Sequence, residues 1–279
     1  MKMATPLKIL NINHHPIEYI EYLTIPHGAL TAQKFQLPIY LGEIEGLAKN
    51  IDSIVVTSDL QGVCRFEHIS NLLLGEVLAE SLPLIYEMYI PQLSLNKSWA
   101  FLCGDLYANL EKRGSSGNPI QVWQAFAKYF DQVIGIAGNH DDFADDLIEL
   151  KLMENVHFLE NDLLKLNGIK VAGLSGIIGR TDKNFRLEEP FYLSAVEKLL
   201  KQQPDIILTH LSPHFEEYGF LGELQLTKIL EKYAENLLCC GHSHWDTSQV
   251  ATLRNNTQIL NADSKVFILI NKNRNNENE

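Results

Sequence analysis

The sequence contains no apolar run of the length that a membrane span requires. A membrane-spanning helix needs about 20 consecutive apolar residues, and no segment of these 279 residues approaches that length. The opening residues, MKMATPLKIL, also lack the long apolar region and the small-residue cleavage site of a secretory signal. We therefore expect a cytoplasmic protein that does not associate with a membrane.

Cysteine and positive charge are both scarce. The four cysteines (Cys64, Cys103, Cys239 and Cys240) show no disulfide framework, which favours buried thiols in a reducing compartment. Only 23 Lys and Arg oppose 35 Asp and Glu, so the net charge is −12 and the basic surface of a general nucleic-acid-binding protein is missing. Nucleic acid is not an expected partner, although a nuclease that works at a metal site stays open.

Neither internal repeats nor a linker between two cores can be found. The composition is 46% hydrophobic, enough for a substantial core. We predict a single domain over residues 1–270, with the motifs in 53–270 and an N-terminal segment, 1–50, whose role the sequence does not assign. The polar end of the chain, residues 271–279, is predicted to be a disordered tail.

Short β-like runs alternate with longer helical patterns along the chain. The apolar, β-branched runs predict strands at 7–13, 53–57, 98–103, 133–137, 155–159, 169–176, 205–209 and 235–240, and a closing pair at 257–263 and 265–270. Helical spacing predicts helices at 39–49, 72–90 with a break at Pro83, 120–130, 190–202 and 222–234. An Asn-Gly turn at 167–168 indicates antiparallel strands on either side of it. This alternation predicts a layered α/β domain.

Five short motifs follow strand-like runs in order along the chain. They are SDLQG (58–62), GD (104–105), GNHD (138–141), TH (209–210) and GHSH (241–244). The polar residues that they place at strand ends are Asp59, Gln61, Asp105, Asn139, His210, His242 and His244. Carboxylates, carboxamides and imidazoles are the ligands that a pair of divalent cations takes from a protein. Singly each residue could be an ordinary turn or cap residue; together they predict a metal centre.

The order of these motifs resembles the calcineurin-like metallophosphoesterase superfamily, over about 59–263. The resemblance implies a four-layer α/β/β/α sandwich of two mixed β-sheets flanked by helices. It also implies hydrolysis of a phosphoester by a metal-activated hydroxide at two divalent ions. Asp105 would bridge the ions; Asp59, Gln61 and His244 would complete the first site, and Asn139, His210 and His242 the second. His140 would protonate or stabilise the leaving oxygen, oriented by Asp141.

One motif departs from the family pattern, which has Asp-x-His where this chain has Asp59 and Gln61. A glutamine oxygen is a harder and weaker ligand than imidazole. We therefore expect weaker binding at the first site, with Mn²⁺ preferred and Mg²⁺, Fe²⁺ or Zn²⁺ as alternatives. Gln61 could instead hydrogen-bond a metal-bound water, and the sequence leaves these two roles open.

Four further residues are candidates for substrate binding. Arg65 follows the first motif, while Arg180 and Arg186 lie in the loop 177–186, which we interpret as a lid. The planar guanidinium group of arginine commonly donates two hydrogen bonds to phosphate oxygens, although each of the three could be a plain surface charge. His214, four residues after His210, could point into the cleft, but Pro213 between them indicates a turn.

The sequence as a whole predicts a metal-dependent phosphoesterase. We favour a small or nucleotide-like phosphodiester as its substrate. The alternatives are a nuclease of the DNA-repair type and a non-catalytic binding or scaffold protein on the same fold, for which Gln61 would be the first sign of a decaying site. Neither the natural substrate nor the oligomeric state follows from the sequence.

Overall fold

The computed structural model describes residues 7–66 and 71–274. Its larger sheet has ten strands in the order β6-β5-β2-β3-β18-β4-β7-β8-β9, with β1 paired to β3. These strands are β1 (Lys8–Ile12), β2 (Glu18–Thr24), β3 (Gln33–Glu45), β4 (Ser53–Ser58), β5 (Val63–Cys64), β6 (Leu72–Leu73), β7 (Trp99–Cys103), β8 (Gln132–Ile136), β9 (Val156–Phe158) and β18 (Lys265–Asn271). Strands β4, β7 and β8 run parallel, so their carboxyl ends lie at one edge.

The second sheet has six strands in the order β10-β11-β14-β15-β17-β16. They are β10 (Asn161–Leu166), β11 (Ile169–Leu174), β14 (Ile206–Thr209), β15 (Leu237–Cys240), β16 (Ala251–Thr252) and β17 (Gln258–Asn261). Here β11, β14, β15 and β17 are parallel. A separate two-stranded ribbon joins β12 (Ile177–Ile178) to β13 (Arg186–Leu187).

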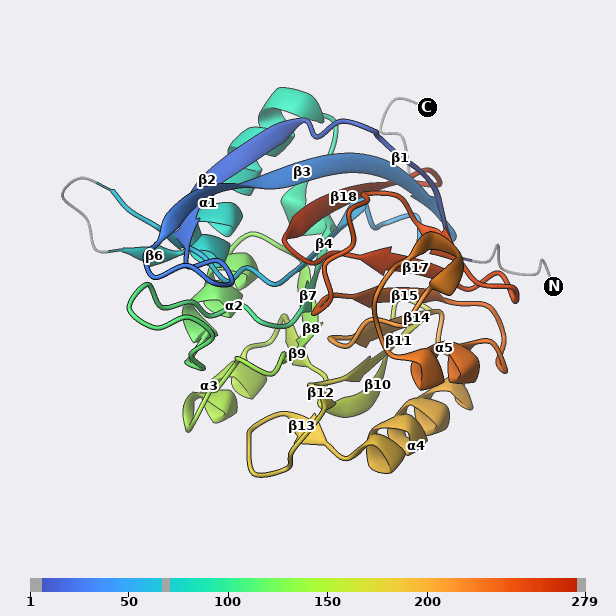
Figure 1. Cartoon of the computed structure of the whole chain (residues 1–279). Coiled ribbons are helices and arrows are strands. Elements are labelled where there is room, and N and C mark those ends of the chain that lie inside the picture. The colour runs from blue at the N-terminus through green and yellow to red at the C-terminus, as the bar shows by residue number, and fades with distance from the viewer. Residues whose placement is uncertain (1–6, 67–70, 275–279) are drawn as a thin grey trace.

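Helices cover the outer face of each sheet (Figure 1). The helices α1 (Leu74–Tyr89), α2 (Ile120–Ala127) and α3 (Asp146–Leu152) pack on the larger sheet, and α4 (Glu189–Leu200) and α5 (Leu224–Leu230) pack on the smaller one. A third apolar core lies between the sheets, where Val56 and Phe101 of the larger sheet meet Leu208 and Cys239 of the smaller one. The four-layer α/β/β/α arrangement is confirmed.

Most predicted elements are present, including the turn at Asn167 and Gly168, where both residues have the positive φ that a tight hairpin needs. The predicted helix at 39–49 is wrong, because these residues belong largely to strand β3. Burial alternates at Leu37 and Ile39 and again at Gly42 and Ile44. The alternation is interrupted between Ile39 and Gly42, so two successive buried residues are three positions apart. That spacing is also typical of a helix.

Helix α1 continues through Pro83 without the predicted break. A proline removes one hydrogen bond of the helix, but Leu78, Leu82 and Ile85 anchor both sides of it in the core.

The expected closing pair of strands is also wrong, since β17 and β18 belong to different sheets. At the carboxyl end, β18 includes Asn271, inside the tail predicted to be disordered; residues 275–279 of that tail lie outside the described residues.

None of the described helices combines the length and the apolar character needed to cross a membrane.

Candidate metal centre and its cavity

Five strands deliver the motif residues to one place. Backbone hydrogen bonds join the strand ends, from Asp59 N to the Gly104 carbonyl at 2.9 Å and from Gly241 N to the His210 carbonyl at 3.1 Å. Between the sheets, His210 Nδ1 lies 2.9 Å from the Cys103 carbonyl oxygen. Three of the seven predicted residues come close together, since ligand atoms of Asp105, His210 and His242 all lie within 4.8 Å of one another.

The backbone is strained where these side chains enter the site. Asp59, Asp105 and His242 have positive φ values of 55°, 55° and 67°, a region that costs a non-glycine residue on the order of 1–3 kcal/mol and that concentrates at functional sites. Gly138 and Gly241 make room for these conformations. A Cβ on Gly138 would lie 2.1 Å from Asp105 Oδ1, and one on Gly241 would lie 2.2 Å from Asp59 Oδ2.

Asp105 is the centre of the cluster. Its Oδ1 accepts the backbone N–H of His140 at 2.7 Å, and its Oδ2 lies 3.2 Å from His210 Nε2. Because the Cys103 carbonyl oxygen can only accept a hydrogen bond, Nδ1 of His210 carries the proton and Nε2 is the nitrogen that faces the carboxylates. Asp59 Oδ1 lies 4.0 Å from the same Nε2.

The charges of the cluster favour a cation between these side chains. Burial lowers the pKa of His210, but the Asp105 and Asp59 carboxylates outweigh it and raise that pKa to about 10. Burial raises the pKa of Asp59 well above its usual value, and the neighbouring charge of Asp263 adds to this. Burial together with His210 lowers the pKa of His242 to about 4, which keeps that imidazole neutral and able to ligate.

Two buried atoms fit metal coordination in particular. Asn139 Oδ1 and His210 Nε2 are both buried without a hydrogen-bond partner, although buried polar atoms are normally paired. Both belong to residues predicted to hold the second ion. The donor set of carboxylate, amide oxygen and neutral imidazole therefore fits divalent metals.

Gln61 lies at the site, and its side chain is engaged with Asp105. Its Nε2 donates a hydrogen bond to Asp105 Oδ2 at 3.2 Å. This contact is neither of the two roles that the sequence leaves open, ligation of the metal and a hydrogen bond to a metal-bound water.

Asp141 holds two motif loops together. Its carboxylate accepts backbone N–H groups of Asp105, Leu106 and Gly138, each at 2.8 Å. Burial, with the charge of Asp105, raises the pKa of Asp141 to about 6. The expected contact that would orient His140 is not among these hydrogen bonds, and Nδ1 of His140 is buried without a partner. Asp141 is therefore a positioning residue for the Asp105 loop.

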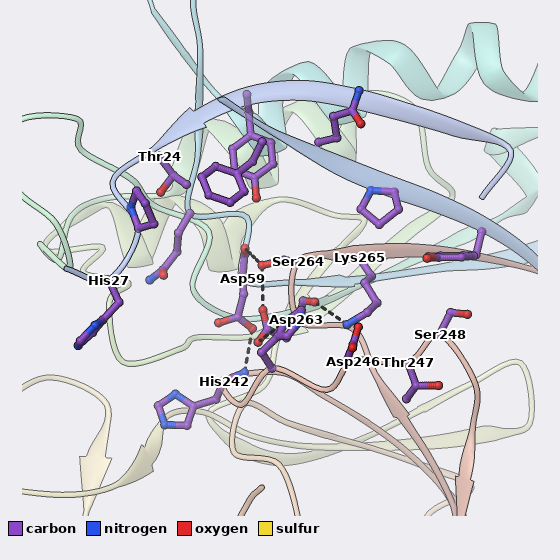
Figure 2. A pocket seen from close by; sticks show the side chains of 18 of the residues that line it. Thr24, His27, Asp59, His242, Asp246, Thr247, Ser248, Asp263, Ser264 and Lys265 are labelled. Atoms are coloured by element: carbon purple, nitrogen blue, oxygen red, sulfur yellow. Dashed lines mark hydrogen bonds and ion pairs between the residues drawn. The ribbon is translucent and has the colours of Figure 1, made fainter. Parts of the chain in front are cut away.

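A cavity of about 830 Å³ opens beside the first-site residues and is lined by Asp59, Gln61, His242 and His244 (Figure 2). Its opposite wall comes from the hairpin of β2 and β3, so the N-terminal segment, to which the sequence assigned no role, covers the site. A second, polar cavity of about 430 Å³ contains His140 and Gln61.

The four predicted substrate residues do not line the larger cavity. Arg65 is exposed, and Arg180 is an exposed residue paired with Asp182 at 3.2 Å. Arg186 lines a different cavity of about 510 Å³ beside Phe143 and Phe185, which also removes the support for loop 177–186 as a lid over the metals. His214 is half-buried, and its carbonyl accepts a hydrogen bond from Thr227.

Sequence reasoning missed three groups at the site. Arg113 lines both cavities, Tyr22 and Phe35 form an aromatic wall, and Asp263 lies beside Asp59 and His244. Asp263 follows a strand, as the motif residues do, so the same sequence pattern could have identified it. Arg113 carried none, because it lies in a polar loop whose path depends on tertiary packing.

The comparisons with known proteins agree with this geometry. Residues 53–246 match the family of calcineurin-like phosphoesterases. The crystal structure of TT1561 of Thermus thermophilus is similar with a TM-score of 0.52 and 14% identity, over 77% of this chain and 90% of that chain. Phosphopantetheinyl hydrolase from Mycobacterium tuberculosis has a TM-score of 0.43 and 14% identity, over 77% and 89%. No curated protein has a significantly similar sequence. Because the family match spans more than half of the chain, this protein belongs to the calcineurin-like phosphoesterases, a family of metal-dependent enzymes.

Proposed function

We propose that this protein is a phosphodiesterase that hydrolyses a small, nucleotide-like phosphodiester at two divalent metal ions. The observation that carries the proposal is the position of the metal residues in the wall of the 830 Å³ cavity. Pockets for small organic ligands span about 300–1,000 Å³. A substrate of this size would therefore bring its phosphoryl group to the metal residues while the cavity holds the rest of the molecule.

The residues divide between the two ions as follows. Asp59 and His244 would hold the first ion, Asn139, His210 and His242 would hold the second, and Asp105 would serve both. When bound, two such ions, Mn²⁺ by preference, would supply positive charge for the phosphoryl oxygens and for a water molecule that attacks the phosphorus. The protein's own part is to fix these ligands, and it does so through the Cys103 carbonyl behind His210 and the hydrogen bond from His242 N to Asp59 Oδ2 at 2.9 Å.

The two cavities favour a diester over a monoester. Both are lined by Gln61 and Arg113, so they adjoin beside the metal residues. A diester has an organic group on each side of its phosphoryl group and could use both cavities, whereas a monoester has only one such group.

The aromatic wall suits an organic group with a flat ring. The rings of Tyr22 and Phe35 lie with centroids 6.1 Å apart, and both line the cavity. Aromatic side chains bind nucleobases by stacking, which contributes about 1–3 kcal/mol per base. His140 and Arg113 both line the adjacent polar cavity, so a leaving oxygen placed there would lie near an imidazole and a guanidinium.

The first test is hydrolysis of bis(p-nitrophenyl) phosphate by the purified protein with added Mn²⁺. Wild type should turn over this diester faster than p-nitrophenyl phosphate, and Asp105→Asn should abolish both activities. Asp246→Asn serves as the control for loss of one acidic charge at the cavity. A strong preference for the monoester would contradict the diester assignment, and equal activity in Asp105→Asn would contradict the metal mechanism. Cleavage of DNA in preference to the small diester would move the assignment to a nuclease.

The proposal places the enzyme in a reducing compartment such as the cytoplasm. The support for this is that all four cysteines are free and buried.

A further inference from the structure

The first metal site lacks an imidazole where Gln61 stands. Gln61 has one oxygen that could ligate, and its nitrogen is committed to Asp105 Oδ2. Asp59, Asp105 and His244 remain as the other ligands of that ion, and the His244 side chain is 64% exposed. A site with so few firm ligands would bind a divalent ion weakly.

Asp263 lies where a further ligand could complete this site. The backbone pairs Ser58 with Asp263, which brings Asp59 and Asp263 to neighbouring positions at the two sheet edges. Ser264 links them, because its hydroxyl donates to Asp263 Oδ1 at 2.8 Å and to the Asp59 carbonyl at 3.4 Å. The second oxygen, Asp263 Oδ2, lies 3.7 Å from His244 Nδ1.

The carboxylates of Asp59 and Asp263 have only histidines as ion-pair partners among the described residues, His210 at 4.0 Å and His244 at 3.7 Å. The side chains of Asp59 and Asp263 are only 10% and 11% exposed. The ammonium of Lys265 donates to the carbonyl oxygen of Asp263 at 3.1 Å (Figure 2) and to that of Trp245 at 3.0 Å, and not to either carboxylate. The distances to the two histidines are longer than hydrogen bonds, and buried carboxylates are costly unless they are closely paired. A cation bound between Asp59 and Asp263 would therefore gain more from the two carboxylates than the histidine contacts supply.

We propose that Asp263 is a ligand of the first metal ion and takes over the position that Gln61 leaves without an imidazole. The inference rests on the proposed two-metal site and adds one residue to it. A carboxylate in place of an imidazole also increases the negative charge around that ion. This change favours Mn²⁺ or Mg²⁺ over softer metals, since oxygen ligands suit the harder ions.

The test counts bound metal and needs no substrate. Purified protein is stripped with a chelator and titrated with Mn²⁺, while electron paramagnetic resonance follows the free ion. Wild type should bind two ions. Asp263→Asn should keep the tighter ion and bind the other more than about 100-fold more weakly, because loss of a residue that only supports a metal ligand already costs about 10–100-fold. Asp246→Asn, a nearby exposed acidic residue on the same cavity wall, should titrate as wild type does.

Thermal unfolding separates a ligand from a merely structural residue. With chelator present, Asp263→Asn should unfold at the wild-type temperature or slightly below it, because the substitution relieves repulsion with Asp59 but gives up the contact with His244. With Mn²⁺, the variant should gain less stability than wild type, since binding stabilises the folded state by mass action. The double variant Asp263→Asn with Gln61→His should recover the lost ion, because an imidazole would then occupy position 61.

Wild-type Mn²⁺ titration by Asp263→Asn would overturn the inference, as would an unchanged gain in unfolding temperature from Mn²⁺. The result does not depend on the proposed activity. If the protein hydrolyses no phosphoester but Asp263→Asn loses one ion, the ligand assignment stands and the proposed function fails. If hydrolysis is found but the titration is unchanged, the function stands and Asp263 is excluded as a ligand.

Discussion

The carboxylate of Asp141 accepts the backbone N–H of Asp105 at 2.8 Å, so the two acidic residues are joined through the main chain rather than through a cation. The same carboxylate accepts the backbone N–H of Gly138 and of Leu106. One side chain therefore fixes the loop that carries Asp105 and the loop that carries Asn139. The contribution of this side chain to the free energy of unfolding can be measured directly.

Asp141→Asn should lower the free energy of unfolding by about 1–3 kcal/mol, the cost of leaving a buried donor without an acceptor. An amide group would turn its own N–H towards backbone donors that need an acceptor. Urea unfolding of the chelated protein measures the change, and Asp145→Asn, an exposed neighbour, is the control. A loss no larger than that of the control would show that these three hydrogen bonds contribute little.

His140→Ala should slow hydrolysis according to the leaving group. The residue lines the polar cavity beside Arg113 and has a buried ring nitrogen without a partner. General acid catalysis contributes typically about 10²–10⁴-fold when the departing oxygen needs a proton. The variant should thus lose far more activity on a diester with an alkyl leaving group than on bis(p-nitrophenyl) phosphate, as comparison of the two kcat/KM ratios will reveal. Equal losses on both substrates would exclude the role of acid.

Arg113→Ala should weaken substrate binding while the metal content stays at the wild-type level. Arg113 lines both cavities, and hydrogen bonds to a charged group contribute about 1.5–3 kcal/mol, which corresponds to roughly 10–100-fold in kcat/KM. Arg113→Lys should recover part of the loss, because it keeps the charge without the planar fork. The adjacent exposed residue supplies the control, Lys112→Ala. If Arg113→Ala behaved like that control, Arg113 would be a plain surface charge.

His157 should make the stability depend on pH. Its Nε2 lies 2.7 Å from Gln132 Oε1, and burial lowers its pKa below the usual 6.5. The unfolded chain then binds more protons than the folded protein below about pH 6.5, so this contribution to stability is lost as the pH falls through that value.

The measurement is the difference in unfolding temperature between about pH 7.5 and pH 5.5, on either side of the reference value for histidine. Wild type should lose more than His157→Gln does over this interval. His15→Gln is the control for removing an exposed histidine. The same slope in wild type and His157→Gln would show that burial of this ring does not couple to folding.

Much of the candidate metal centre was predictable because its residues obey one local rule: a polar residue follows a buried, apolar strand. Asp59, Asp105 and His210 all meet it, and parallel neighbours bring their ends together. The arginines at the site were not predictable by such a rule. Whether Arg113 or Arg180 faces the cavity depends on how loops pack, and neither composition nor spacing encodes that.

The errors in the fold have local causes. The interrupted alternation of buried residues around Gly42 made strand β3 look like a helix in the sequence. A Cβ added at Gly42 would lie 2.6 Å from the Asn11 carbonyl oxygen, because β1 passes very close to β3 there. Without β3 the role of the N-terminal segment could not be assigned. The partner of that strand, β18, lies more than 200 residues away in the sequence, a distance at which no periodicity gives information.

The strand order β2-β3-β18-β4 has a consequence for biosynthesis. The hairpin that walls the cavity joins the metal-bearing part of the sheet through β18, which pairs with β3 on one side and β4 on the other. During translation β2 can pair with β5 soon after the first motif is made, but β3 becomes joined to β4 only when residues 265–271 have left the ribosome. All five motifs emerge before that moment, whereas the wall of the cavity is complete only after it. The residues of the candidate metal centre are thus all synthesised before the sheet beside them closes.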